Sequence, residues 1–278
     1  MKRFYIETFG CQMNAHDSEK IAGSLAALGY ARVDCPENAD LVLYNTCSVR
    51  EKAERKVYNR LAQFRRSGGG RLFGVLGCVA EQEGTRIFDR APHVALVCGS
   101  ASYGRFPELI AALERGERRV AGLGFEAAGA FETPHILRES PFKASVTIME
   151  GCGRKCAYCV VPSVRGPERS RSSAAILEEV ASAASSGGTE VLLLGQNVNS
   201  YRDPSAASLD FPSLLARVAA VAGLRRVRFA TSHPCDFTRA IVEAMDANPA
   251  LCGHIHLPVQ SGSTSVLRRM RRGYSRED

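Results

Sequence analysis

Residues 144–166, ASVTIMEGCGRKCAYCVVPSVRG, place three cysteines on one short loop directly after an apolar run that is typical of a buried strand. Cys152, Cys156 and Cys159 follow a C-x3-C-x2-C spacing. A structural zinc site needs a closed shell of four ligands, and neither a second cysteine pair nor a histidine follows soon after Cys159. Three thiolates on a four-iron, four-sulfur cluster would instead leave one iron open for a substrate or cofactor. The spacing alone favours an iron–sulfur site, with zinc and ordinary core thiols as the alternatives.

The composition is that of a globular chain long enough for two domains. Of its 278 residues, 45% are hydrophobic and 23% are charged, and no apolar run has the length of a signal peptide core or a membrane span. We therefore expect a cytoplasmic protein without a membrane partner. Ten cysteines in that compartment indicate ligands, reactive thiols or small core residues rather than disulfides. The formal net charge of +7 suggests an anionic partner such as nucleic acid.

The N-terminal part alternates strand-like and helix-like segments. The strand-like runs are RFYIETF (3–9), the weaker ARVD (31–34), LVLYN (41–45), RLFGVLG (71–77) and HVALVCG (93–99). We expect a first helix that is capped by Asp17 or Ser18 and ends near Gly29, and a charged helix over residues 50–66. A β-α-β-α order predicts a parallel sheet with right-handed crossovers, flavodoxin-like or Rossmann-like in outline, and we expect the flavodoxin-like form.

Cysteines follow several of these strands at the point where each strand ends. Cys11, Cys47 and Cys78 come just after the first, third and fourth runs, and the carboxyl ends of parallel strands share one edge of a sheet, where ligands collect. The topology thus predicts a second group of three thiols. Cys35 and Cys98 also lie at or near strand ends, and Cys98 occupies an ordinary core position. The pattern alone does not select three of the five.

The C-terminal part repeats a strand followed by a helix. A Gly- and Ala-rich connector (118–140) precedes it, and strands are expected before the cysteine loop and at TEVLLLG (189–195), LRRVRFA (224–230) and GHIHLPV (253–259). Polar residues follow the last three strands, among them Gln196, Asn197, Ser232 and Gln260. Polar groups at the C-terminal ends of the strands are what the active site of a (β/α) barrel requires. Because only four strands are visible, we expect a truncated piece of a longer barrel.

Arginines gather in three places in this part, at residues 165–171, 225–228 and 268–272. Most charge clusters are solvated helix faces, but several near one rim would suit a phosphate backbone.

Motifs along nearly the whole chain resemble a known family. They are TFGCQMNAHDSEKIAGSL, LVLYNTCSVREKAERK, GVLGCVAEQEG, IMEGCGRKCAYCVVPSVRG, LLGQNVNSY, TSHP and HLPVQSGSTSVLRRMRRGY. The fourth of these motifs, in which the aromatic Tyr158 precedes Cys159, resembles the signature of the radical S-adenosylmethionine (SAM) superfamily. Together the motifs resemble its methylthiotransferases, and specifically the tRNA-2-methylthio-N6-dimethylallyladenosine synthase family.

The resemblance implies two [4Fe-4S] clusters and SAM as cofactors. It assigns Cys11, Cys47 and Cys78 to an auxiliary cluster, and Cys152, Cys156 and Cys159 to the cluster that generates the radical and acts in catalysis. Cys35 and Cys98 match no ligand, and Cys235 and Cys252 are left as structural. The residues expected to bind the SAM cofactor are Tyr158, Gln196, Asn197, Ser232 and Gln260.

The implied reaction is methylthiolation of C2 of N6-isopentenyladenosine next to the tRNA anticodon, with one SAM as methyl donor and a second as the source of an adenosyl radical. The implied partners are tRNA, a sulfur donor and a reductant such as flavodoxin or ferredoxin, with a monomeric protein. The expected domains are an N-terminal methylthiotransferase domain (1–117), the connector (118–140) and an incomplete radical SAM barrel (141–278), without the C-terminal RNA-binding TRAM domain of the family.

Sister methylthiotransferases are the nearest alternatives, and they act on threonylcarbamoyladenosine in tRNA or on an aspartate of a ribosomal protein. GCQMN and NTCSVREKAE favour the prenyl-adenosine branch. A more remote alternative is a non-catalytic iron–sulfur or zinc protein that binds RNA.

Overall fold

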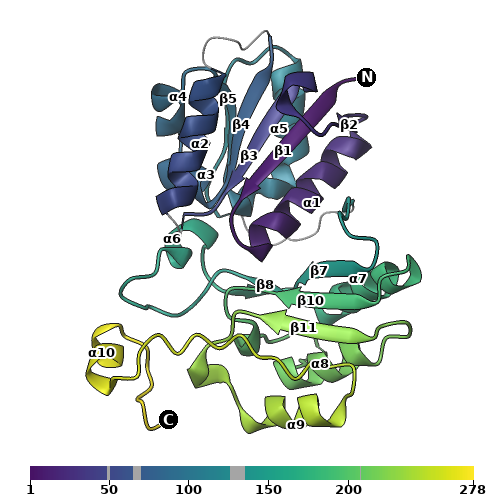
Figure 1. Ribbon diagram of the computed structural model, residues 1–278, viewed down its shortest axis with the longest axis vertical. Coiled ribbons are helices and arrows are strands. Elements are labelled where there is room, and N and C mark those ends of the chain that lie inside the picture. Colours follow the sequence, from purple (N-terminus) through teal and green to yellow (C-terminus); the bar gives the residue numbers. More distant parts are fainter. Residues whose placement is uncertain (49–50, 65–69, 126–134, 207) are drawn as a thin grey trace. The chain divides into compact units, whose positions relative to one another are not determined.

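The computed structural model describes residues 1–48, 51–64, 70–125, 135–206 and 208–278, and Figure 1 shows its elements. The chain forms two compact units. Unit 1 comprises Met1–Leu137 with Ser163–Arg165, and unit 2 comprises Arg138–Pro162 with Gly166–Asp278. Both ends of the expected charged helix and residues 126–134 of the expected connector lie outside the described residues.

Unit 1 is built on a parallel sheet of six strands in the order β2-β1-β3-β4-β5-β6. The strands are β1 (Arg3–Phe9), β2 (Ala31–Arg32), β3 (Leu41–Thr46), β4 (Leu72–Gly77), β5 (Val94–Cys98) and β6 (Val120–Gly122). The prediction of a parallel flavodoxin-like sheet is confirmed. The short apolar runs of β3 and β5 form strands because both faces of a parallel sheet are covered by helices, and every residue of these two strands is buried.

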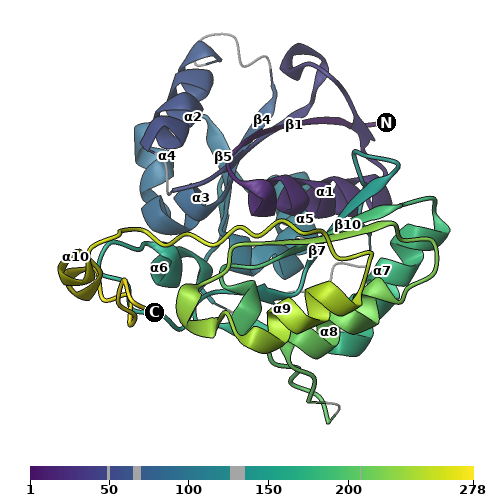
Figure 2. The same cartoon turned by 60° about the horizontal axis from the view of Figure 1, so that its bottom comes forward.

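Helices cover both faces of this sheet, as Figures 1 and 2 show. They are α1 (Gln12–Ala27), α2 (Glu51–Gln63), α3 (Cys78–Glu83), α4 (Arg86–Arg90) and α5 (Phe106–Glu114), with 3-10 turns at Pro36–Asn38 and Ser100–Arg105. Apolar residues of α1 and α5 pack with Leu41 and Leu43, whereas those of α2 and α4 pack with Val42 and Tyr44. Alternate residues of β3 therefore face opposite cores, as the twofold period of a strand requires.

Two sequence expectations for unit 1 were wrong in detail. Helix α1 begins at Gln12 with Cys11 as its N-cap, six residues before Asp17, the nearer of the two expected caps, and Asp17 and Ser18 are buried inside it. Their short polar side chains serve tertiary hydrogen bonds instead of a cap. The sheet also extends into the expected connector, because Val120–Gly122 pairs with β5.

Unit 2 contains a parallel sheet of three strands in the order β11-β10-β7. Its elements are β7 (Lys143–Thr147), β8 (Met149–Glu150), α6 (Val161–Arg165, which ends in unit 1), β9 (Arg169–Ser170), α7 (Ser173–Ser185), β10 (Glu190–Leu194), α8 (Phe211–Ala219), β11 (Arg226–Ala230), α9 (Arg239–Ala247) and α10 (Thr264–Arg269), with 3-10 turns at Val198–Ser200 and Pro234–Asp236. Apolar residues of α7, α8 and α9 form one core with the strands. None of the described helices has the length and apolarity that a membrane crossing requires.

The fourth strand expected at residues 253–259 does not form. Only a single bridge joins Leu251 to Val227, although the N–H of Ser232 still donates to the carbonyl of His256 at 3.2 Å. Thr231 has a φ of +73°, and its N–H donates to the imidazole of His256 rather than to a carbonyl. A residue in this left-handed conformation ends a regular ladder, so β11 stops before it can pair further.

Candidate iron–sulfur sites

The first candidate site lies at the C-terminal edge of the sheet in unit 1. Cys11 follows β1, Cys47 follows β3 and Cys78 follows β4, and these strands are neighbours whose ends lie in register. The N–H of Cys47 donates to the carbonyl of Phe9 at 2.9 Å, so the ladder continues up to the cysteine. The parallel topology brings three residues that are distant in sequence to one edge of the sheet.

Gly77 forms the sharp turn between β4 and α3, the helix that begins at Cys78. Its φ is +88°, a conformation that glycine adopts without penalty. A Cβ at this position would lie 2.4 Å from Oδ1 of Asn45 and 2.6 Å from the carbonyl oxygen of Thr46. The turn therefore needs glycine for both its backbone angle and its close approach to β3, and it fixes the point at which Cys78 leaves the sheet.

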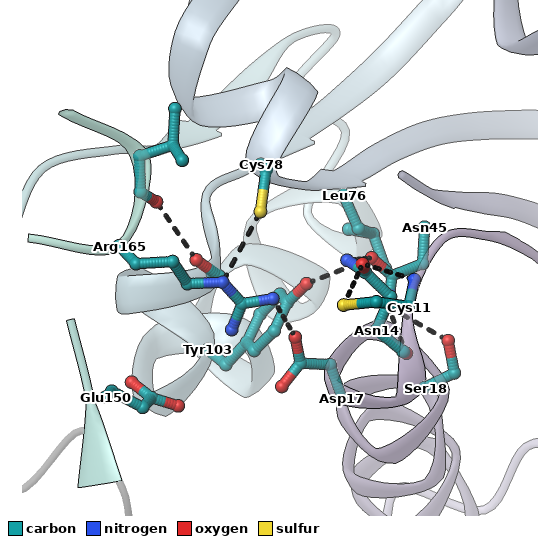
Figure 3. A network of polar contacts seen from close by, with 12 residues as sticks. Cys11, Asn14, Asp17, Ser18, Asn45, Leu76, Cys78, Tyr103, Glu150 and Arg165 are labelled. Atoms are coloured by element: carbon teal, nitrogen blue, oxygen red, sulfur yellow. Dashed lines mark hydrogen bonds and ion pairs between the residues drawn. The ribbon is translucent and has the colours of Figure 1, made fainter. Parts of the chain in front are cut away.

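A buried network of polar side chains supports the ends of these strands (Figure 3). Asn45 donates to the Asn14 carbonyl at 2.8 Å and to the Ser18 hydroxyl at 3.0 Å, and it accepts from the Tyr103 hydroxyl at 3.4 Å. Oδ1 of Asn14 accepts from the N–H of Cys11 at 3.3 Å, which is one half of a capping box. Because buried polar groups are costly when left unpaired, the network holds the backbone at Cys11 in one position.

An ion pair lies beside the third cysteine. Arg165 donates from Nε to the sulfur of Cys78 at 3.4 Å and from Nη2 to Oδ2 of Asp17 at 2.7 Å (Figure 3). The side chains of Arg165 and Asp17 are only 3% and 0% exposed. The Ser100 hydroxyl donates to the carbonyl of Val164 at 3.3 Å, which fixes the backbone next to Arg165. A positive charge is thus held in a dry environment against a thiol.

The thiol of Cys11 is favoured as a thiolate. The hydrogen bond from Cys47 lowers the pKa of Cys11 to about 6, and the backbone N–H of Asn14 and the positive charge of Arg165 act in the same direction against the effect of burial. Iron is ligated by thiolates rather than thiols. The surroundings of Cys11 therefore prepare it as a ligand.

The chemistry of the donor set suits an iron–sulfur cluster. Across the described ranges, no group of three or more His, Cys, Asp or Glu side chains is arranged to hold one metal ion. A tetrahedral zinc would need its sulfur ligands about 2.3 Å from a common point, whereas a four-iron cubane is larger and its ligands stand farther apart. Three thiols, one with a lowered pKa, beside a buried cation suit a negatively charged cluster.

The second candidate site is the loop of unit 2 that joins β8 to α6. Cys152, Cys156 and Cys159 are all partly exposed. The N–H of Cys159 donates to the carbonyl of Cys156 at 3.1 Å, and the N–H of Arg154 donates to the sulfur of Cys152 at 3.4 Å. Burial raises the pKa of Cys152. Two backbone N–H groups of the loop therefore donate to atoms of the same loop.

A segment more than 100 residues later in sequence holds this loop. Nη1 of Arg272 donates to the sulfur of Cys156 at 3.3 Å, and the guanidinium lies 5.4 Å from the ring centroid of Tyr274. The N–H of Ala157 donates to the carbonyl of Met270 at 3.0 Å. The residues after α10 therefore contribute to the second site.

The loop is also tied to the ends of β10 and β11. Arg154 forms an ion pair with Asp236, and Asn197 donates to the same carboxylate at 2.7 Å. Although burial opposes it, the hydrogen bonds from Arg154 and Asn197 hold the pKa of Asp236 below its usual value. The N–H of Gly151 donates to Oε1 of Gln196 at 2.6 Å. Gln196 and Asn197 are therefore positioned next to the loop.

The residues expected to bind SAM differ in exposure. Oδ1 of Asn197 and the hydroxyl of Ser232 are buried, and neither has a hydrogen-bond partner within the described part of the chain. Two such atoms at the ends of neighbouring strands suit the polar groups of a bound cofactor. Tyr158 is half exposed, and Gln260 is exposed in a left-handed conformation with φ of +68°. The structure places Gln196 and Asn197, but not Gln260, in contact with the residues around the cysteine loop.

Several residues around the two sites were not identified from the sequence as site residues. They are Asn14, Asp17, Asn45, Tyr103, Asp236 and the two arginines Arg165 and Arg272. Asn14 follows Cys11 by three residues, which is the capping-box spacing and the one available signal. The arginines belonged to clusters expected to face solvent or phosphate, yet both are nearly buried and bind thiols of this chain.

Two family models and several curated relatives match this chain. Residues 3–99 match the family model described as uncharacterized protein family UPF0004, and residues 146–278 match the radical SAM superfamily. The chain is 62% identical over 278 residues to tRNA-2-methylthio-N(6)-dimethylallyladenosine synthase of Solibacter usitatus, and 50% identical over 280 residues to the protein of the same name from Geobacter sulfurreducens. The alignments cover 100% and 99% of this chain but 62% and 63% of those relatives, so the chain spans less than two thirds of their length.

A solved structure shares the fold. The radical SAM methyltransferase TsrM from Kitasatospora setae, with its tryptophan substrate and a SAM analogue bound, aligns with a TM-score of 0.59 at 14% identity, over 90% of this chain and 58% of that one. The UPF0004 match thus falls within unit 1, and the match to the radical SAM superfamily falls almost entirely within unit 2.

Proposed function

We propose that this protein is a cytoplasmic tRNA methylthiotransferase that modifies C2 of N6-isopentenyladenosine next to the anticodon. The observation that carries the proposal is the combination of two groups of three cysteines with alignment along the entire chain to relatives named for this reaction. One group would suffice for a radical SAM enzyme. The second group, at the edge of the unit 1 sheet, would hold the sulfur-bearing cluster that methylthiolation requires.

Each group of cysteines would hold one [4Fe-4S] cluster through three thiolates and leave one iron open. When bound, the clusters and SAM supply the methyl group, the transferred sulfur and the radical that the reaction requires. The chain itself orients them. Arg165 and Arg272 donate to one ligand sulfur in each group, and such hydrogen bonds orient ligands and tune the metal.

The SAM site would lie at the ends of β10 and β11 in unit 2. Among the described residues, the buried Oδ1 of Asn197 and hydroxyl of Ser232 have no hydrogen-bond partner there, so they would bind the cofactor. Gln196 accepts from the N–H of Gly151, next to the cysteine loop. Tyr158 and Gln260 are retained as cofactor-binding residues in this proposal. Polar atoms at the C-terminal ends of parallel strands are the usual ligand-binding position of such folds.

The proposed partners follow from the reaction. They are tRNA, a reductant such as flavodoxin or ferredoxin, and a sulfur donor. The protein itself acts as a monomer in this proposal. The formal net charge of +7 favours association with tRNA through its phosphates.

Nucleoside analysis of tRNA tests the proposal. A strain that lacks the gene is expected to accumulate isopentenyladenosine and to lose its methylthio derivative, and the gene should restore it. A normal level of the methylthio derivative in the deletion strain would refute the proposal. Loss of methylthio-threonylcarbamoyladenosine instead would assign the protein to the sister branch.

A further inference from the structure

The ion pair between Arg165 and Asp17 is the most deeply buried charge pair near either candidate site. Its side chains are 3% and 0% exposed, and its nitrogen and oxygen are 2.7 Å apart. Burying such a pair costs desolvation that its attraction often fails to offset, and apolar residues of similar volume frequently serve stability as well. Stability alone therefore explains its presence poorly.

Its position suggests a different role. Arg165 uses Nη2 for Asp17 and Nε for the sulfur of Cys78, so one planar side chain joins a carboxylate to a thiol. Asp17 lies on α1, the helix capped by Cys11, and Cys78 is the first residue of α3. The pair thus connects the two helices that begin at two of the three cysteines.

The electrostatic consequence depends on both partners. A guanidinium that donates to a ligand sulfur withdraws electron density and stabilises the extra electron of a reduced cluster, and hydrogen bonds to sulfur, net charge and exposure set cluster potentials. The carboxylate of Asp17 lies on the other side of the guanidinium and offsets part of its charge. The neighbouring Tyr103 phenol stays neutral, because burial raises its pKa well above the usual value.

We infer that Arg165 is a positioning residue of the auxiliary cluster, which orients Cys78 and, counterbalanced by Asp17, sets the reduction potential of that cluster. The inference rests on the proposed function, because it requires a cluster on Cys11, Cys47 and Cys78. It assigns opposite electrostatic effects to two residues in the same ion pair.

The test uses the full chain with Cys152, Cys156 and Cys159 replaced by Ala, so that only the auxiliary cluster is present after anaerobic reconstitution. The reduction potential is measured by titration followed by electron paramagnetic resonance. Arg165→Gln should shift the reduction potential to more negative values. The expected shift corresponds to a tenfold lower ratio of reduced to oxidised cluster at the same applied potential, which is about 59 mV for one electron. Asp17→Asn should shift it in the positive direction.

Two further variants separate positioning from folding. Arg165→Lys keeps the charge but lacks the planar fork, so it should shift the potential less than Arg165→Gln. Arg171 is a similarly buried arginine of unit 2 whose Nη1 donates to the Thr147 carbonyl at 2.8 Å and to Glu179 at 2.7 Å, so Arg171→Gln should leave the potential unchanged. If Arg165→Gln does not fold, the direction of the Asp17→Asn shift decides, since that variant retains Arg165.

Shifts of the same sign in Arg165→Gln and Asp17→Asn, or unchanged potentials in both, would overturn the inference while leaving the proposed function intact. Failure of the parent variant to bind any iron would overturn both.

Discussion

The two groups of cysteines are built in opposite ways. Cys11, Cys47 and Cys78 come from three strands of unit 1 and meet only when the sheet has formed, and two of them are buried. The other group occupies one loop of eight residues in unit 2, and its thiols are all partly exposed. The first site therefore depends on the fold of a whole unit, whereas the second depends on a local turn and the segment that holds it.

An arginine donates to one sulfur in each group, but the two arginines have different surroundings. Arg165 is paired with Asp17, a buried carboxylate. Arg272 instead packs against the ring of Tyr274 and donates to the carbonyl of Pro258 at 3.2 Å. We expect the carboxylate of Asp17 to offset part of the positive charge of Arg165. The positive charge of Arg272 should act more strongly on Cys156, because its partners Tyr274 and Pro258 are neutral. Variants of the cysteines, the arginines and the supporting backbone can separate the two groups.

The largest expected effect separates the roles of the two groups. Cys156→Ala should abolish SAM cleavage under strong reductant, because the proposed function makes Cys156 a ligand of the radical-generating cluster. Cys47→Ala should spare cleavage and abolish methylthio insertion. Liquid chromatography and mass spectrometry of 5′-deoxyadenosine and of tRNA nucleosides measure both. Equal loss of the two activities in both variants would show that the groups do not act separately.

Arg272→Met should weaken the second site alone. Removal of a group that orients a metal ligand typically lowers affinity or activity by about tenfold or more, so SAM cleavage should fall by about tenfold while iron at the first site is retained. Arg269→Met, on the exposed side of α10, is the matched control and should behave as the unchanged chain. An unaltered rate in Arg272→Met would contradict the assigned contact with Cys156.

Gly77→Ala should weaken the first site through the backbone. Alanine at a positive φ lowers the free energy of unfolding by more than about 1 kcal/mol, and here its Cβ would also collide with β3. Gly29→Ala is a control in the same unit, because Gly29 has a φ of +83° but no atom within 4 Å of the added Cβ. Chemical denaturation and iron binding should show a greater loss for Gly77→Ala. Equal losses would mean that the turn does not position Cys78.

The smallest effect concerns thiol reactivity in the iron-free chain. With a pKa of about 6, Cys11 should be mostly thiolate at pH 7 and should react with iodoacetamide well below the pH that Cys152 needs, since burial raises the pKa of Cys152. Cys47→Ala removes the hydrogen bond that lowers the pKa of Cys11 and should move its reactivity to higher pH. Peptide mass spectrometry over a pH series follows each cysteine. A profile of Cys11 unaffected by Cys47→Ala would contradict the contact between them.

The sequence predicted the sheet of unit 1 well because its strands are short apolar runs closed by cysteine or glycine, as in LVLYNTC. It misplaced the start of α1, because Asp17 and Ser18 are good caps by residue type, whereas Cys11 is an unusual one. The actual start is fixed by Asn14, whose role depends on contacts with β3. The capping preference of Asp17 and Ser18 was therefore outweighed by the hydrogen bonds that Asn14 makes with β3.

The expected strand at residues 253–259 failed for a related reason. GHIHLPV has the apolar pattern of a strand, but β11 ends at Ala230, just before Thr231 turns left-handed, and a single sequence does not report that angle. The buried roles of Arg165 and Arg272 were also beyond the sequence, since charge clusters usually face solvent. Only the fold shows which arginine of a cluster lies against a thiol.

Quantification of iron and sulfide after anaerobic reconstitution tests the central claim most directly. The account predicts about eight irons per chain from two four-iron clusters, and about four in each of two variants, one with Cys11, Cys47 and Cys78 replaced by Ala and the other with Cys152, Cys156 and Cys159 replaced. About four irons in the unaltered chain, or a variant that retains all of its iron, would contradict it.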